Sequence, residues 1–131
     1  MIEAIWRIAG RHFDGVAFCQ RFGLRPAVIR SHANGVSANI PIPGTRGARS
    51  PDAAIRRFLK RHRQALSWLK RRHVASSLDV GFTVGSDKHF TRTVRFAPDV
   101  LTACARANLT LEVSAYPSNG VARGTKTGGL G

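Results

Sequence analysis

Several short segments of this chain alternate apolar and polar residues, and this alternation most constrains how it can fold. In residues 77–84 the apolar side chains are Leu78, Val80, Phe82 and Val84. A period of two is the side-chain period of a β-strand, so the segment predicts a strand with one apolar face. Further strands are predicted at residues 2–8, 27–30, 36–42, 90–96 and 109–115. Strands of this kind need a second layer against their apolar faces.

Helix signals separate these strands. A short helix is predicted after Asp14, whose carboxylate can accept from the free amides of the first turn, and Gly23 predicts its end. A long helix begins at Pro51 and reaches Arg72, and a third begins at Pro98. The order of elements predicts an α+β fold. We expect a single-domain two-layer sandwich, in which a mainly antiparallel sheet of four to six strands is covered by one long and two short helices.

Two details of this arrangement follow from composition. Pro41 and Pro43 cannot donate to a sheet, so the strand at residues 36–42 is expected at an edge. The 131 residues fit one domain, which we expect over residues 1–116. Residues 117–131 contain little apolar material, so we expect them to form a disordered C-terminal tail.

Positive charge is the unusual property of the chain. Its 21 Lys and Arg residues against 7 Asp and Glu residues give a formal net charge of +14. Such a charge opposes folding by self-repulsion and attracts polyanions. The candidate partners are nucleic acid, an anionic membrane surface and an acidic protein. The alternative is a basic surface without an anionic partner.

Much of this charge lies in the predicted long helix. On a helical wheel, one face carries an apolar stripe of Ile55, Phe58, Leu59, His62, Leu66 and Leu69. The opposite face carries Arg56, Arg57, Lys60, Arg61, Arg63, Lys70, Arg71 and Arg72. The stripe predicts packing against the sheet, and the basic face is the candidate partner-binding surface. A merely solvated face is the alternative, because like charges at this spacing cost little.

Trp68 falls outside the apolar stripe, among the arginines. An exposed tryptophan in such surroundings can stack on a base or anchor a protein contact, so Trp68 is a further candidate partner-binding residue. The alternative is that it packs beneath residues 31–49 or stacks with an arginine of its own helix.

Patterns typical of catalysis or metal binding are absent from the sequence. The five histidines have neither HxxxH nor HxH spacing, and the seven acids are scattered rather than paired. We therefore expect no enzymatic activity, no cofactor and no metal site. Cys19 and Cys104 each fall on the apolar side of a predicted helix, which predicts buried, reduced thiols.

The first ten residues do not resemble a secretory signal. They include Glu3 and Arg7 and contain no continuous apolar stretch. No apolar run approaches the length that crosses a bilayer. We expect a soluble, cytoplasmic protein.

Four short motifs suggest a family. They are G-x-x-F-D before the first helix, G-L-x-P after it, F-x-P-x-x-L at the start of the last helix, and Tyr-Pro after the final strand. With the long middle helix, they resemble the small bacterial domains classed as domain-of-unknown-function family 4279, over residues 1–118 apart from residues 31–49. The resemblance implies a compact α+β domain and brings no catalytic residues. The cationic middle helix and the tail depart from the family's usual pattern.

Together these features predict a non-enzymatic binding module that engages an anionic partner through the basic face of the long helix. Nucleic acid, bound without strong sequence specificity, is the first candidate, since the sequence contains no motif for reading bases. The alternative is a protein-binding inhibitor or immunity-type protein that recognises an acidic protein. A third hypothesis, an enzyme with an unrecognised site, would require a concave pocket with convergent polar groups.

Overall fold

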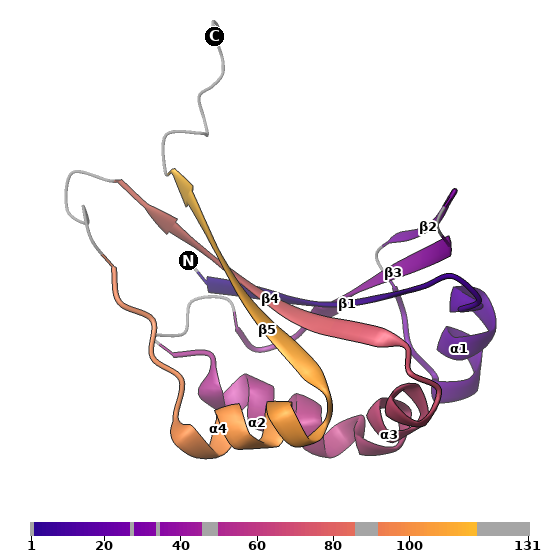
Figure 1. The fold of residues 1–131 in the computed structure, drawn as a ribbon. Coiled ribbons are helices and arrows are strands. Elements are labelled where there is room, and N and C mark those ends of the chain that lie inside the picture. The colour runs from indigo at the N-terminus through magenta and orange to yellow at the C-terminus, as the bar shows by residue number, and fades with distance from the viewer. Residues whose placement is uncertain (1, 27, 34, 46–49, 86–91, 118–131) are drawn as a thin grey trace, which may run out of the picture.

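The computed structural model describes residues 2–26, 28–33, 35–45, 50–85 and 92–117. Over these residues the chain forms five strands and four helices (Figure 1). In chain order they are β1 (Ile2–Gly10), α1 (Gly15–Phe22), β2 (Val28–His32), β3 (Gly35–Ile42), α2 (Asp52–Arg61), α3 (Arg63–Arg71), β4 (Ala75–Val84), α4 (Pro98–Arg106) and β5 (Leu109–Pro117).

The strands form one mixed sheet in the order β2-β3-β1-β4-β5, which confirms the predicted α+β class. The pairings β2–β3, β3–β1 and β1–β4 are antiparallel, whereas β4–β5 is parallel. The parallel pair arises because the chain crosses back through α4 between the two strands, as a parallel connection requires. Helices α2, α3 and α4 lie together on one side of the sheet (Figure 1).

The core lies between that helical layer and the facing side of the sheet. Trp6 is at its centre, paired in register with Ile40 on β3 and Leu78 on β4. The Trp6 ring makes edge contacts with Phe18 of α1 and Phe58 of α2, at centroid distances of 6.0 and 4.9 Å. A buried indole N–H needs an acceptor, and the Trp6 Nε1–H donates to the Ser76 hydroxyl over 2.8 Å.

The predicted long helix is two helices, so the prediction of one long and two short helices is wrong. The break lies at His62, whose backbone angles of φ −106° and ψ 24° leave the helical region. Neither Gly nor Pro occurs between residues 52 and 71, so the cause is not a local helix breaker. At the break, the His62 ring packs against the rings of Trp6 and Phe58, at centroid distances of 5.8 and 5.3 Å.

Strand β3 is inside the sheet rather than at its edge, which corrects the expectation drawn from its prolines. It pairs with β1 on one side and β2 on the other. In this register β2 begins at Val28, opposite Asn39. Among the described pairings Pro41 therefore lies opposite Ile5 of β1 and no residue of β2, which is the edge-like environment that proline tolerates in a sheet.

The strand predicted at residues 90–96 is not formed in its described part. Residues 92–97 approach α4 without pairing into the sheet, and Phe90 lies outside the described residues. The Ala97 N–H donates to the Asp52 carboxylate, at 3.2 Å from either oxygen, rather than to a neighbouring strand. Strand β5 extends to Pro117, one residue beyond the expected domain boundary, and the rest of the predicted tail lies outside the described residues.

Candidate functional site

The apolar stripe of the basic segment, residues 56–72 with the preceding Ile55, packs inward as predicted. Ile55, Phe58, Leu66 and Leu69 are buried, and Leu59 and His62 are half-buried. All eight predicted cationic residues of the segment are exposed. Packing of one flank against the sheet therefore leaves every guanidinium and ammonium group of this segment at the surface.

The eight cations do not form a single face, because the break and the neighbouring elements divide them. Arg57 and Arg61 border a hollow beside β3. Arg63 and Arg71 border a second hollow, beside Phe22 of α1. Lys60, Arg63 and Lys70 border a third, toward α4. The positive charge thus surrounds α2 and α3 on three sides.

Half of these cations have partners within the molecule. Arg56 makes two hydrogen bonds to the Asp99 carboxylate, from Nε at 2.9 Å and from an η-nitrogen at 3.0 Å. These bonds hold the pKa of Asp99 below its ordinary value. Lys70 Nζ donates to the Arg106 carbonyl over 2.7 Å, and Arg71 donates to the Ser67 hydroxyl over 2.7 Å.

Arg72 also has an internal partner, because its guanidinium lies over the Trp68 ring, 4.0 Å from the ring centroid. Within the described part of the chain, no hydrogen bond or ion pair occupies the side chains of Arg57, Lys60, Arg61 or Arg63. These four charges face solvent without compensation.

Trp68 is not the exposed anchor that the helical wheel suggested. It is half-buried against α1, with centroid distances of 5.5 Å to Phe18 and 6.1 Å to Phe22. Its Nε1 is buried and has no hydrogen-bond partner among the described residues. The described ring contacts come from α1, and residues 34 and 46–49 of the segment 31–49 that was expected to cover Trp68 lie outside the described residues. The stacking on Arg72 was among the expected outcomes.

The hollow toward α4, which we call the helix groove, is the largest of these three hollows, at about 940 Å³. Its apolar lining consists of Leu59, Leu66, Ala103 and Ala107. Its cationic lining consists of Lys60, Arg63, Lys70 and Arg106. Asp99 is its one acidic lining residue in the described structure, and that carboxylate is already bonded to Arg56. Arg106 was not a predicted site residue, because only the packing of α4 brings it to the basic segment.

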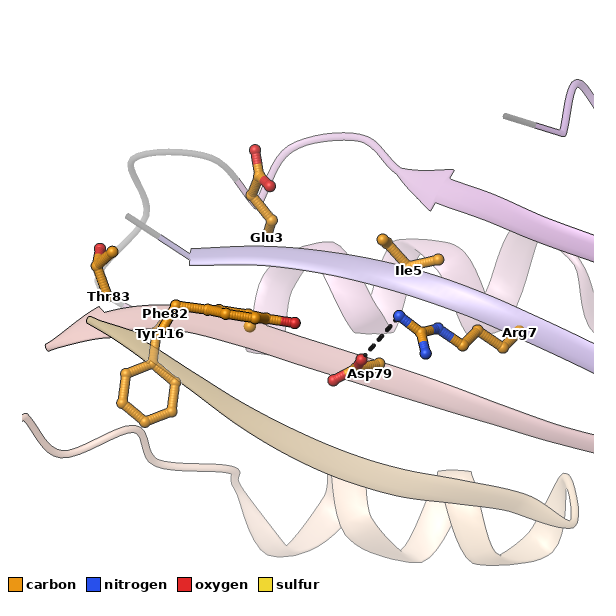
Figure 2. Close-up of a pocket in the computed structure, with 8 residues that line it drawn as sticks. Glu3, Ile5, Arg7, Asp79, Phe82, Thr83 and Tyr116 are labelled. Atoms are coloured by element: carbon orange, nitrogen blue, oxygen red, sulfur yellow. Dashed lines mark ion pairs between the residues drawn. The ribbon is translucent and has the colours of Figure 1, made fainter. Parts of the chain in front are cut away.

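The opposite face of the sheet carries a smaller hollow of about 210 Å³ (Figure 2). Asp79 is buried there, although it projects from the face away from the helices. It forms an ion pair with Arg7 over 3.1 Å and accepts from the Ser114 hydroxyl over 2.8 Å. The Tyr116 ring lies over Gly81, where a Cβ atom would approach the ring to 2.9 Å.

This second hollow was missed by sequence reasoning, since it depends on register. Arg7, Asp79 and Ser114 come from three strands and meet only because β1, β4 and β5 are neighbours. Asp79 is engaged by both Arg7 and Ser114, so the arrangement holds a charged acceptor in place. It does not leave that carboxylate available as a general base.

The two cysteines belong to the interior of the fold. Cys19 and Cys104 are buried and unpaired, and burial raises the pKa of both thiols. Across the described ranges, no three or more His, Cys, Asp or Glu side chains gather as metal ligands would. None of the described helices has the length and apolar character needed to traverse a bilayer.

Comparison of the chain with family models, with curated proteins and with solved structures found no match. The resemblance to family 4279 stays a prediction that depends on the four short motifs alone.

Proposed function

We propose that this chain is a non-enzymatic binding module that holds an anionic partner against α2 and α3. The supporting observation is that four exposed cations, Arg57, Lys60, Arg61 and Arg63, lie close together in sequence without any compensating contact in the described structure. Uncompensated charge of one sign raises the local concentration of an oppositely charged partner and speeds its association.

Nucleic acid bound without strong sequence specificity is the first candidate partner. Cations on three sides of α2 and α3 suit a partner whose phosphates are spread along a backbone. The second candidate is an acidic protein, which would make the chain an inhibitor or immunity-type protein. The apolar lining of the helix groove favours this second candidate, since phosphates gain nothing from Leu59 or Ala103.

The test measures binding of fluorescent anionic probes as salt is raised from about 50 to about 300 mM. The probes are a duplex DNA, a single-stranded RNA and polyglutamate. For duplex DNA, the logarithm of the binding constant should fall with the logarithm of salt concentration by about 0.9 for each phosphate contact. Absence of binding to every probe at the lowest salt would refute the proposal.

Two variants of equal net charge test which surface of the protein binds the probe. The triple variant Lys60→Gln, Arg61→Gln, Arg63→Gln removes three cations from the basic segment and should weaken binding at least tenfold. The triple variant Arg11→Gln, Arg30→Gln, Arg95→Gln removes three exposed cations elsewhere and should weaken it far less. Equal losses in the two variants would mean that net charge, rather than this surface, attracts the probe.

A further inference from the structure

Two contacts join the walls of the helix groove, one made by α2 and one by α3, and both reach α4. At one end Arg56 bonds to Asp99, and at the other Lys70 bonds to the Arg106 carbonyl. Lys70 follows Arg56 by 14 residues, whereas Arg106 follows Asp99 by 7. At about 1.5 Å per helical residue, the α2–α3 wall is about twice as long as the α4 wall.

Between these two contacts, the groove exposes apolar surface. Leu59, Ala103 and Ala107 are each half-buried, so part of every side chain remains accessible, and Leu66 closes the floor. Apolar surface gathered in one depression and rimmed by polar groups is typical of an interaction site. Alanines on the α4 side leave room for side chains of a partner.

The cationic residues around this floor favour a partner with negative charge. Lys60, Arg63 and Arg106 have no carboxylate partner in the described structure, and Lys70 reaches only a carbonyl oxygen. Asp99, the one carboxylate that lines the groove among the described residues, is already bonded to Arg56. A complementary surface therefore has an apolar ridge with carboxylates on both sides.

We infer that the helix groove binds an acidic amphipathic helix of a protein partner. This inference rests on the proposed function and develops its second candidate, an acidic protein. A helix presents apolar residues at i, i+4 and i+7 along about 10 Å, which matches the α4 wall between Asp99 and Arg106. Glutamates flanking that ridge would reach the lysines and arginines of the rim.

The lining of the helix groove suits nucleic acid poorly. Bases bind through stacking on aromatic rings, and none lines the groove in the described structure. Trp68, which follows the lining residue Ser67 in sequence, contacts Phe18 and Phe22 of α1 instead. An apolar floor also offers nothing to a phosphate backbone.

The experiment compares two fluorescent synthetic peptides of about 15 residues with identical composition, rich in Glu and Leu. In the patterned peptide the leucines form one helical stripe, and in the scrambled peptide they do not. At about 150 mM salt the patterned peptide should bind at least tenfold more tightly, because only its leucines can enter the groove together. Chemical-shift changes on binding should include the amides of Leu59, Ala103 and Ala107.

Two substitutions on α4 locate the binding. Ala103→Gln places a longer polar side chain on the floor and should reduce the affinity of the patterned peptide to that of the scrambled one. Ala105→Gln makes the same change at an exposed position of the same helix and should leave the affinity unaltered. Circular dichroism melting curves verify that both variants are folded.

The other outcomes separate this inference from the proposed function. Equal affinities for the two peptides, both reduced by the Lys60, Arg61, Arg63 triple variant, would overturn the groove assignment and leave the anionic-partner module standing. Duplex DNA that binds more tightly than the patterned peptide and displaces it would overturn the assignment in favour of nucleic acid. Failure of every anionic probe at about 50 mM salt would overturn both.

Discussion

His62 ends α2 and begins α3, and its ring lies between these helices and the core. Burial is the main cause, and the neighbouring Arg61 charge the second, of a pKa below the ordinary value of histidine. The folded protein therefore favours the neutral ring. When pH falls below about 6.5, unfolded chains take up a proton that folded chains resist, so stability decreases toward acid pH.

We predict that the free energy of unfolding falls between pH 7.5 and pH 5.5, and that His62→Gln makes this fall smaller. Urea unfolding at several pH values measures the slope. The control is His12→Gln, which removes an exposed histidine and should preserve the slope of the parent protein. Asp99, whose pKa is lowered by Arg56, titrates at more acid pH and does not enter this window. An unchanged pH dependence of the free energy of unfolding in His62→Gln would contradict the contribution assigned to burial of the His62 ring.

Trp68 shows what a helical wheel can and cannot predict for one residue. The wheel correctly separated the inward stripe, because the direction of a side chain relative to its own helix is a local property. It could not reveal that α1 lies alongside α3 and supplies Phe18 and Phe22 to the flank of that stripe. Lateral packing of this kind depends on the whole fold.

Helix α1 was predicted correctly because both of its ends are marked within a few residues. The Asp14 carboxylate accepts from the Ala17 N–H over 3.0 Å, and Gly23 ends the helix with a positive φ of 64°. The Leu24 N–H then donates to the Cys19 carbonyl over 2.8 Å, which completes a common helix stop. The break between α2 and α3 has no such marker in the local sequence. It coincides instead with packing of the His62 ring against Trp6, a residue distant in sequence.

The cap of α1 should therefore contribute measurably to stability. We predict that Asp14→Ala lowers the free energy of unfolding by about 1 kcal/mol, because the first-turn amides lose their acceptor. Asp14→Ser keeps an oxygen at the same position and should retain most of that free energy. Urea unfolding of both variants measures the difference, and an equal loss in the two would contradict the role of the cap.

For the whole molecule, most strands and their inward faces were predictable, with residues 90–96 as the exception, whereas the neighbours of each strand were not. Alternation along residues 77–84 marks the apolar side of β4 whatever lies next to it. The order of the sheet, the parallel pairing of β4 with β5 and the internal position of β3 depend on contacts between distant segments. The same is true of the helix groove, whose cationic rim combines predicted residues with Arg106 from α4.

The formal net charge of +14 should act on folding as well as on binding. In the folded state, helical spacing places pairs such as Arg57–Lys60 and Arg57–Arg61 on adjacent turns of α2, closer than most unfolded conformations hold them. Salt screens this repulsion, with a screening length of about 8 Å at about 0.15 M. We predict that the melting temperature rises by a few degrees as sodium chloride increases from about 20 to about 300 mM.

Most of that rise should occur below about 0.15 M, because screening over the distances between these side chains is then largely complete. The Lys60, Arg61, Arg63 triple variant removes three of the charges that repel one another. It should therefore have a higher melting temperature at low salt and gain less from added salt. The triple variant of Arg11, Arg30 and Arg95 should respond more nearly as the parent does, since those residues are far apart in sequence and share no helix. Calorimetric melting curves compare the three proteins. A melting temperature that is flat with salt, or that rises equally in all three, would mean that the clustered cations do not repel one another appreciably in the fold.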